Sequence, residues 1–471
     1  MNRLRLCAAT LLTGLLTTAS ATAVNAADLG GNCCADLEER VAELEATTVR
    51  KGNRKVSLAI TGYVAEQLMW YDNGVADDLY VTGIGSTLNT NFKLTGSANI
   101  NSDVTAGYVI QVEVGTSDPL TAGNSAFGDD GPSAYHITNT NGGLSSPSVD
   151  VLYSYWFMQS KRLGKVTVGQ LPQASEHAAV LVDGSGSFVA ANWVPLNGTA
   201  INLASGNSEL TLPNGAGLAL GALQWCSSTS LPIAGDCNAI PINGVRYDSP
   251  TFAGFSVSAT WGEDDFWDVA GRFAGEFNGI KLAASIAYSQ NRDETNLTGF
   301  NTVLGLSPLQ SRDSGYLQIG AYIEHVPTGL FLYGAYGKEY NKNVYNNMPA
   351  AKGFDPTGTG AISTWGEPDG NTWYIKAGLR RKWMPLGHTV LYGDYSERND
   401  TFAANLAAYG VTDSKVTQYG LGIVQEIDAA AMSLWVNWNH SDPEAHTASG
   451  ANAFGKLEDI DVVTAGALIS F

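Results

Sequence analysis

The side chains best suited to covalent or metal chemistry in this chain are its five cysteines and six histidines. Cys226 and Cys237 bracket a short polar stretch, a spacing that suits a disulfide in an exported protein. Cys33 and Cys34 are adjacent, which leaves an intersubunit bond or two free thiols as alternatives. No HExxH, CxxC or GxSxG motif is present, so a catalytic dyad would have to be assembled from distant loops. We therefore expect no enzyme activity, no metal site and no cofactor.

Acidic residues are in excess in the chain, because 45 Asp and Glu stand against 26 Lys and Arg and give a formal net charge of −19. Nucleic-acid binding needs clustered positive charge that displaces counterions from phosphates, so this class of partner is excluded. Only 15% of the residues are charged, whereas 10% are aromatic and 53 are glycine. This composition is typical of one large β structure and argues against disorder.

The N-terminal residues indicate export. Arg3 and Arg5 precede an apolar stretch, and small residues follow it, which is the pattern of a secretory signal peptide over residues 1–26. Beyond this segment no apolar run approaches the roughly 20 residues that a membrane helix needs. A membrane-spanning form of this chain must therefore be a closed β-barrel.

Residues 27–55 are predicted to contain a short helix followed by a basic linker. Leu37, Val41 and Leu44 alternate in spacings of four and three, which is the seam of a coiled coil. The seam covers barely two heptads, and a helix this short is marginal alone in water. Two interpretations stay open: the helix lies on a larger body, or it joins several copies of the chain in a small bundle.

From Val56 onward the periodicity is that of β-strands. Between residues 267 and 278, one face is apolar, whereas the other carries Asp268, Arg272 and Glu276. Alternation alone does not distinguish a soluble sandwich from a barrel. The sixteen predicted strands cover residues 56–72, 88–101, 104–115, 150–161, 164–171, 240–249, 253–262, 266–278, 279–291, 314–326, 329–341, 371–385, 388–399, 414–427, 431–442 and 457–471.

The connections between these strands distinguish the two architectures. Alternate connections are tight, as at 278–279 and 385–387. The intervening ones are mostly long and polar, at 73–87, 116–149, 172–239, 292–313, 342–370, 400–413 and 443–456, with one short exception at 263–265. Outer-membrane barrels alternate tight periplasmic turns with long outer loops, whereas sandwiches have no reason to sort their loops. We predict an all-β fold, a sixteen-stranded antiparallel transmembrane β-barrel over residues 56–471.

Aromatic residues support this prediction. The last predicted strand ends the chain at Phe471, and a C-terminal aromatic on a strand resembles the recognition signal of bacterial outer-membrane barrels. Phe471 is therefore a candidate membrane-assembly signal. Further aromatic residues lie near predicted strand ends, where rings favour the lipid interface, namely Trp70, Tyr71, Trp261, Trp267, Trp373, Trp383 and Trp438.

Three segments of the chain resemble the porins of alphaproteobacteria. They are the acidic helix, basic linker and first strand at 34–63 (CADLEERVAELEATTVRKGNRKVSLAITGY), the run VRYDSP at 245–250, and the terminal Phe471. The resemblance covers the layout of the whole mature chain. It implies a trimeric barrel in the outer membrane with a periplasmic N-terminal helix, and a third long loop, here 172–239, folded inward as a constriction. That region is long for this role.

A sixteen-stranded barrel leaves an aqueous channel after its inward side chains are accommodated. We expect passive diffusion of ions and small hydrophilic solutes, with selectivity set by pore width and wall charge. The surplus of carboxylates favours cations. Candidate lining residues are Lys93, Glu113, Arg246, Arg272, Lys376 and Arg380 on the wall, and Glu176, Asp183, Glu209 and Asp236 on the inward loop.

Two other functions remain in consideration. A sugar-specific channel would use aromatic rings such as Tyr153, Tyr155 and Trp156 to grip its substrate. A structural protein would use the N-terminal helix to tether the outer membrane to the cell wall. The predicted partners are two further copies of the chain, outer-membrane lipid and lipopolysaccharide, and small solutes and ions.

Overall fold

The computed structural model describes residues 56–85, 88–115, 119, 148–191, 198–211, 217–226, 236–238, 240–263, 265–292, 313–349 and 361–471. The signal peptide predicted over residues 1–26 and the helix and linker predicted over 27–55 lie outside the described residues. Cys33, Cys34, Leu37, Val41 and Leu44 therefore lie outside them as well. Within the described ranges, no helix is long and apolar enough to cross a membrane.

The fold consists almost entirely of β-strands that run antiparallel to their neighbours. The strands of the main sheet are β1 (Ser57–Asp72), β2 (Asp77–Thr82), β3 (Asn91–Asn99), β4 (Val104–Gly115), β5 (Ser148–Ser160), β6 (Gly164–Leu171), β9 (Ile242–Asp248), β10 (Phe255–Gly262), β11 (Trp267–Phe277), β12 (Ile280–Asn291), β13 (Ser314–His325), β14 (Leu330–Asn341), β17 (Asn371–Met384), β18 (Gly387–Asn399), β19 (Val411–Ile427), β20 (Met432–Thr447) and β21 (Ile460–Ser470). Shorter elements lie in the connections, namely β7 (Ala204–Ser205), β8 (Ser208–Glu209), β15 (Val344–Pro349), β16 (Ala361–Gly366), η1 (Leu220–Leu223), η2 (Ala404–Tyr409) and η3 (Asp428–Ala430).

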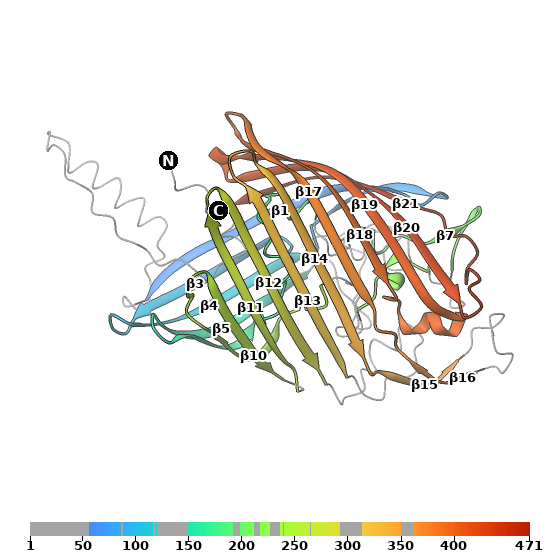
Figure 1. Ribbon diagram of the computed structural model, residues 1–471, viewed down its shortest axis with the longest axis horizontal. Coiled ribbons are helices and arrows are strands. Elements are labelled where there is room, and N and C mark those ends of the chain that lie inside the picture. The colour runs from blue at the N-terminus through green and yellow to red at the C-terminus, as the bar shows by residue number, and fades with distance from the viewer. Residues whose placement is uncertain are drawn as a thin grey trace.

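The sheet closes on itself. β1 pairs with β21 along most of its length, from Tyr63 opposite Ser470 to Asp72 opposite Asp461. On its other edge β1 pairs with β2 in one half and with β3 in the other, so these two strands share one position in the wall. The main sheet is thus a closed sixteen-stranded barrel, as predicted, and Figure 1 shows its inclined strands.

The long loop predicted at 73–87 is wrong, because β2 lies within it. A tight turn joins β1 to β2, and the side chain of Asn73 closes this turn by accepting hydrogen bonds from the N–H groups of Val75 and Ala76. β2 ends at Thr82 and β3 begins at Asn91, and between them the Leu88 carbonyl accepts a hydrogen bond from the Tyr63 hydroxyl. Glycines on both sides of β2 and two adjacent aspartates within it gave residues 73–87 the composition of a loop.

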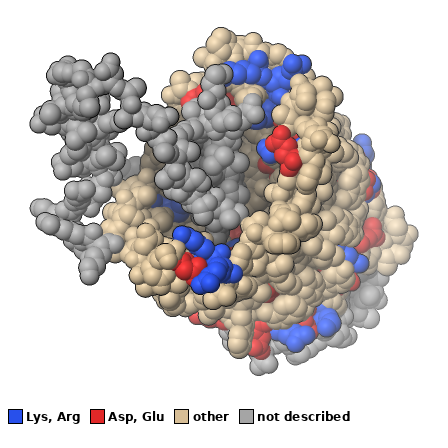
Figure 2. All heavy atoms as spheres, turned by 60° about the vertical axis from the view of Figure 1, so that its left-hand side comes forward, with Lys and Arg blue, Asp and Glu red and all other residues tan. Residues whose placement is uncertain are grey.

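The two ends of the barrel differ in their connections. Tight turns join the strands at one end, for example at Asn278 and Gly279, whose φ angles of 50° and 76° suit a two-residue hairpin. The C-terminus lies at this end, whereas the hairpin of β15 and β16 lies at the opposite end (Figure 1). Figure 2, turned toward the end with the C-terminus, shows Lys and Arg side chains gathered in separate groups there.

The outer face of the barrel is apolar. Its exposed side chains include Leu68, Ile110, Val257, Ile323 and Leu421, each on a different strand. A soluble protein would bury such a continuous surface, whereas a membrane barrel presents it to lipid. Tyr71 was wrongly expected at the lipid interface. It follows Trp70, so alternation turns its ring inward, where it is buried and stacks on Tyr80.

Candidate permeation pathway

The long connection after β6 enters the barrel and contacts inward-facing side chains of one strand after another. Its first residues bind to β10 and β11. The N–H of Ala174 donates to Oγ1 of Thr260 at 2.7 Å, and the N–H and hydroxyl of Ser175 donate to Asp268 Oδ2 at 2.7 and 2.6 Å. Thr260 and Asp268 are buried, because alternation points them away from the lipid.

The next residues bind to β13 and β14. Gln318 donates to the Ser175 carbonyl and accepts from the N–H of Ala179, both at 2.8 Å, and the Tyr333 hydroxyl donates to the Ala179 carbonyl at 2.9 Å. The backbone of Ala179 approaches Gly320 so closely that a Cβ there would lie 2.2 Å from the Ala179 oxygen. The wall therefore needs glycine at this point.

A buried ion pair holds the segment to β17. Lys376 Nζ lies 2.6 Å from Asp183 Oδ2 and 2.9 Å from the Ser187 hydroxyl, and the two charged side chains are 0% and 2% exposed. The ammonium also lies 5.6 Å from the centre of the Tyr333 ring and 5.5 Å from that of Tyr392. These contacts compensate a charge that would otherwise be costly to bury.

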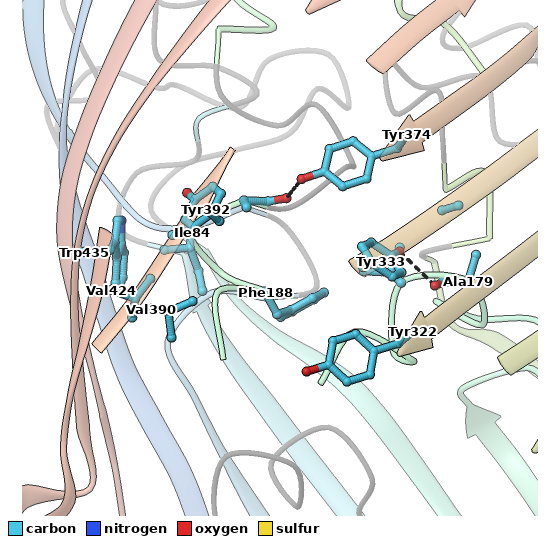
Figure 3. Packing of buried hydrophobic residues seen from close by; sticks show 14 of the residues in the cluster. Ile84, Ala179, Phe188, Tyr322, Tyr333, Tyr374, Val390, Tyr392, Val424 and Trp435 are labelled. Atoms are coloured by element: carbon cyan, nitrogen blue, oxygen red, sulfur yellow. Dashed lines mark hydrogen bonds between the residues drawn. The ribbon is translucent and has the colours of Figure 1, made fainter. Parts of the chain in front are cut away.

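The segment then reaches the far wall. The Tyr374 hydroxyl donates to the Ala191 carbonyl at 2.8 Å, and Asn437 on β20 donates to the Ala190 carbonyl. Figure 3 shows Phe188 between Val390 on one side and Tyr322 and Tyr333 on the other. Residues 172–191 thus run inside the barrel from the end of β6 to β20.

The later part of the connection, where the structure describes it, packs at the end away from the C-terminus. Its buried residues join a second cluster with Met69 and Tyr71 of β1; they are Ile201, Leu203, Leu218, Leu220 and Leu223. Glu209 accepts a hydrogen bond from Asn73 at 2.9 Å and another from Asn202 at 3.1 Å. Glu209 therefore lies apart from the other acids of the inward loop.

A set of buried polar groups joins the beginning of this connection to its end, and we call these four residues the clasp: Tyr153, Glu176, His177 and Asp236. His177 Nδ1 is hydrogen-bonded to Asp236, and the Tyr153 hydroxyl donates to Glu176. His177 and Asp236 are 7% and 0% exposed. Next to Asp236, Cys237 forms a disulfide with Cys226.

Burial and mutual attraction oppose each other in the clasp. Burial raises the pKa of Glu176 to about 7, against the attraction of protonated His177, which lowers it. Burial by itself would lower the pKa of His177, but Asp236 and Glu176 raise it to about 9. His177 is therefore cationic near neutral pH, and Glu176 changes its charge there.

The remaining candidate lining residues lie on the inner wall. Arg246 binds Asp248 through two nitrogens at 2.6 and 2.9 Å and donates to the Pro172 carbonyl at 2.9 Å. Arg272 donates to the Ser258 hydroxyl at 2.6 Å and to the Ala174 carbonyl. Both arginines thus hold the start of the inward segment.

Three further wall candidates have different surroundings. Glu113 accepts a hydrogen bond from the N–H of Asn89 at 2.7 Å and is buried. Arg380 pairs with Glu426 at 2.8 Å. Lys93 is half-buried on β3.

The structure brings some candidates together and separates others. Lys376 meets Asp183, and Glu176 and Asp236 flank His177. Sequence reasoning missed the residues that attach the segment to the wall, namely Asp268, Gln318, Tyr333, Tyr374 and His177. Alternation shows that the strand residues among them face away from lipid, but it cannot show which loop they meet.

The aromatic set considered for sugar binding does not form. Tyr153 and Tyr155 face the interior, and their ring centres are 6.4 Å apart. Trp156 is 50% exposed on the outer face, because it alternates with them along β5. These three rings therefore cannot make one stacking surface.

Comparison with known proteins identifies the family. A family model described as Gram-negative porin matches residues 8–433. The chain belongs to the Gram-negative porins. This porin is a channel protein of the outer membrane, and its family and fold point to a channel rather than an enzyme.

The chain is also similar to solved structures, and the first of them shows the same type of fold. An anion-selective porin from Comamonas acidovorans is 15% identical, covers 88% of this chain and 100% of its own, and superposes with a TM-score of 0.52. OmpF of Salmonella typhi is 13% identical over 89% of this chain and 99% of its own, with a TM-score of 0.48. The trimer form of Vibrio cholerae OmpT is 12% identical over 88% and 99%, with a TM-score of 0.46. No curated protein matches the chain.

Proposed function

We propose that this porin is a general diffusion pore whose narrowest zone is formed by residues 172–191 against the inner wall. The observation that carries the proposal is the path of this segment, which is bound successively to β10, β11, β13, β14, β17 and β20. Because the segment is fixed to so many strands, it narrows the lumen of the barrel. It is not free to move and close the lumen. Hydrated ions and small polar solutes would pass beside it.

The charged groups at this zone would set its selectivity. Arg246, Arg272 and Lys376 lie on the wall against which the segment rests, and Glu176, Asp183 and Asp236 lie on the segment or at the end of its loop. Lys376 pairs with Asp183 across the contact, Arg246 pairs with Asp248 on the wall, and Glu176 and Asp236 flank His177. We propose that they act as a fixed dipolar lining that favours polar solutes over apolar ones.

The assembly and setting of the porin are also proposals. The resemblance of residues 34–63 to alphaproteobacterial porins supports a place in that subfamily and a homotrimer, and it favours an assembly role for Leu37, Val41 and Leu44. Outer-membrane lipid and lipopolysaccharide would cover the apolar outer face. A tether to the cell wall through residues 27–55 is the second candidate, and their deletion would separate the two roles.

Planar-bilayer recording of the purified protein tests the proposed function. We expect stepwise conductance in KCl, closing in threes, together with liposome permeability to small sugars that falls smoothly with solute size. Sealed liposomes would overturn a general pore, and transport that saturates with one sugar would identify a specific channel instead.

A further inference from the structure

Two lysines on the inner wall are cations without a direct ion pair in the part of the chain that the structure describes. Lys165 is the second residue of β6 and is only 9% exposed. Lys93 is half-buried on β3, and its positive charge acts on Lys165. Neither ammonium forms an ion pair with a described carboxylate, although a buried cation is costly without one.

Aromatic rings lie beside Lys165. The Nζ atom of Lys165 lies 4.6 Å from the centre of the Phe157 ring and 5.7 Å from that of Tyr155. Such contacts stabilise an ammonium but leave its charge uncompensated. The wall therefore offers one cationic head next to a ring surface, within the electrostatic reach of a second cation, Lys93.

The acids in this region form their direct contacts with other groups. Asp248, opposite Lys165 in the register, attracts the Lys165 ammonium without forming an ion pair with it, and its Oδ1 is held by Arg246 at 2.6 Å. Glu113 accepts from the N–H of Asn89 at 2.7 Å, and Glu176 belongs to the clasp. An anion supplied from outside can meet the two lysines without displacing these contacts.

We propose that Lys93, Lys165, Tyr155 and Phe157 form a binding site, one step along the permeation pathway. This site would take small organic carboxylates that bear an apolar or aromatic body. The carboxylate would accept charge-assisted hydrogen bonds from the two ammonium groups, and the body would pack on the rings. This inference rests on the proposed function, because the site binds solutes that diffuse through the lumen of the pore. Lys165 lies next to the tight turn at 161–163, so the step is placed toward the end of the barrel that carries the C-terminus.

The inference makes a distinction between anions of equal charge. Chloride would gain only the electrostatic attraction, whereas a carboxylate with a ring would gain ring contacts as well. Benzoate should therefore bind more tightly than acetate, and acetate about as weakly as chloride.

Block of the KCl current by potassium benzoate tests the proposal in planar bilayers. We expect saturable block in the native porin and, in the double variant Lys93→Gln/Lys165→Gln, a half-blocking concentration that is about tenfold higher. Lys415→Gln is the matched control, because Lys415 lies on β19 at the opposite end and pairs with Glu397 at 3.2 Å. Benzoate should block the current through this control variant at the same concentration as in the native porin.

Other outcomes overturn the inference. Equal block of the native porin and the double variant, or equal block by benzoate and acetate, would show that no carboxylate step exists at these lysines. Lys165→Arg keeps the charge and should keep the block, which separates loss of the site from misfolding. Absence of any KCl conductance in the native protein would instead contradict the proposed pore itself.

Discussion

At the scale of residues, buried charge determines how firmly the inward segment is held. Lys376 and Asp183 come from β17 and the loop, and both side chains are almost fully removed from water. Such a pair adds little net stability over two apolar residues, but removing one partner leaves an uncompensated charge. The pair therefore fixes the position of the segment rather than the stability of the barrel.

Lys376→Met should release this part of the segment from the wall. The orphaned Asp183 carboxylate would cost about 3–5 kcal/mol if it stayed buried, so we expect the segment to move toward water. Single-channel recording should then show a larger and noisier conductance, while the barrel remains folded on a heat-modifiability gel. Lys382→Met is the control, since its pair with Asp428 is about half exposed, and an unchanged conductance in Lys376→Met would contradict the proposed constriction.

The titration of Glu176 predicts that the ion selectivity of the pore depends on pH. Burial raises its pKa to about 7, so its carboxylate is charged above this pH and neutral below it. Acidification from pH 8 to pH 6 removes one negative charge from the lumen, and the preference for cations over anions should fall. Reversal potentials in a KCl gradient measure this shift, and Glu176→Gln should behave at both pH values like the native porin at pH 6. A shift of the same size in the variant would assign the titration to another group.

At the scale of elements, the strands were predictable and the contacts of the long loop were not. The alternation from Trp267 to Phe277 depends on neighbours in the chain and correctly assigned both faces of β11. The bond between Ser175 and Asp268 joins residues 93 positions apart, and no local pattern encodes it. β2 was missed for a related reason, because its place in the wall is defined by pairing with β1 rather than by its own composition.

Gly320 offers a test of how closely the loop and the wall fit. Any Cβ at this position would lie 2.2 Å from the Ala179 oxygen, so Gly320→Val should push the segment off β13 at a cost of about 1–3 kcal/mol. We expect altered conductance and new protease cleavage near Ala179 in an otherwise folded barrel. Gly334→Ala is the matched control, because the nearest atom to its added Cβ is 3.6 Å away. Native conductance in Gly320→Val would show that the segment does not rest there.

At the scale of the whole molecule, net charge is a poor guide to the lumen. Several acids lie near the barrel end opposite the C-terminus, where the side chains of Asp413, Glu444 and Asp459 are about half exposed. Those charges act on the outer surface and its surroundings. The excess of carboxylates in the sequence therefore does not translate directly into the potential that a permeating ion meets.

Closure of the barrel depends on the seam between its first and last strands. Phe471 takes part in this seam, because its N–H donates to the Gly62 carbonyl at 3.0 Å and its own carbonyl accepts from the Gly62 N–H at 3.1 Å. Phe471→Ala keeps these backbone bonds and removes only the ring, whereas deletion of Phe471 removes both. The two variants thus separate recognition of the ring from closure of the seam.

If the ring is the assembly signal, Phe471→Ala should reach the outer membrane poorly in cells yet refold from urea into detergent at the native rate. The deletion should be impaired in both settings, because refolding in detergent still has to close the seam. Heat-modifiability on gels measures the folded fraction in each case. Normal assembly of Phe471→Ala in cells would show that the ring is not read as a signal, and native refolding of the deletion would show that β1 and β21 close without this last pair of hydrogen bonds.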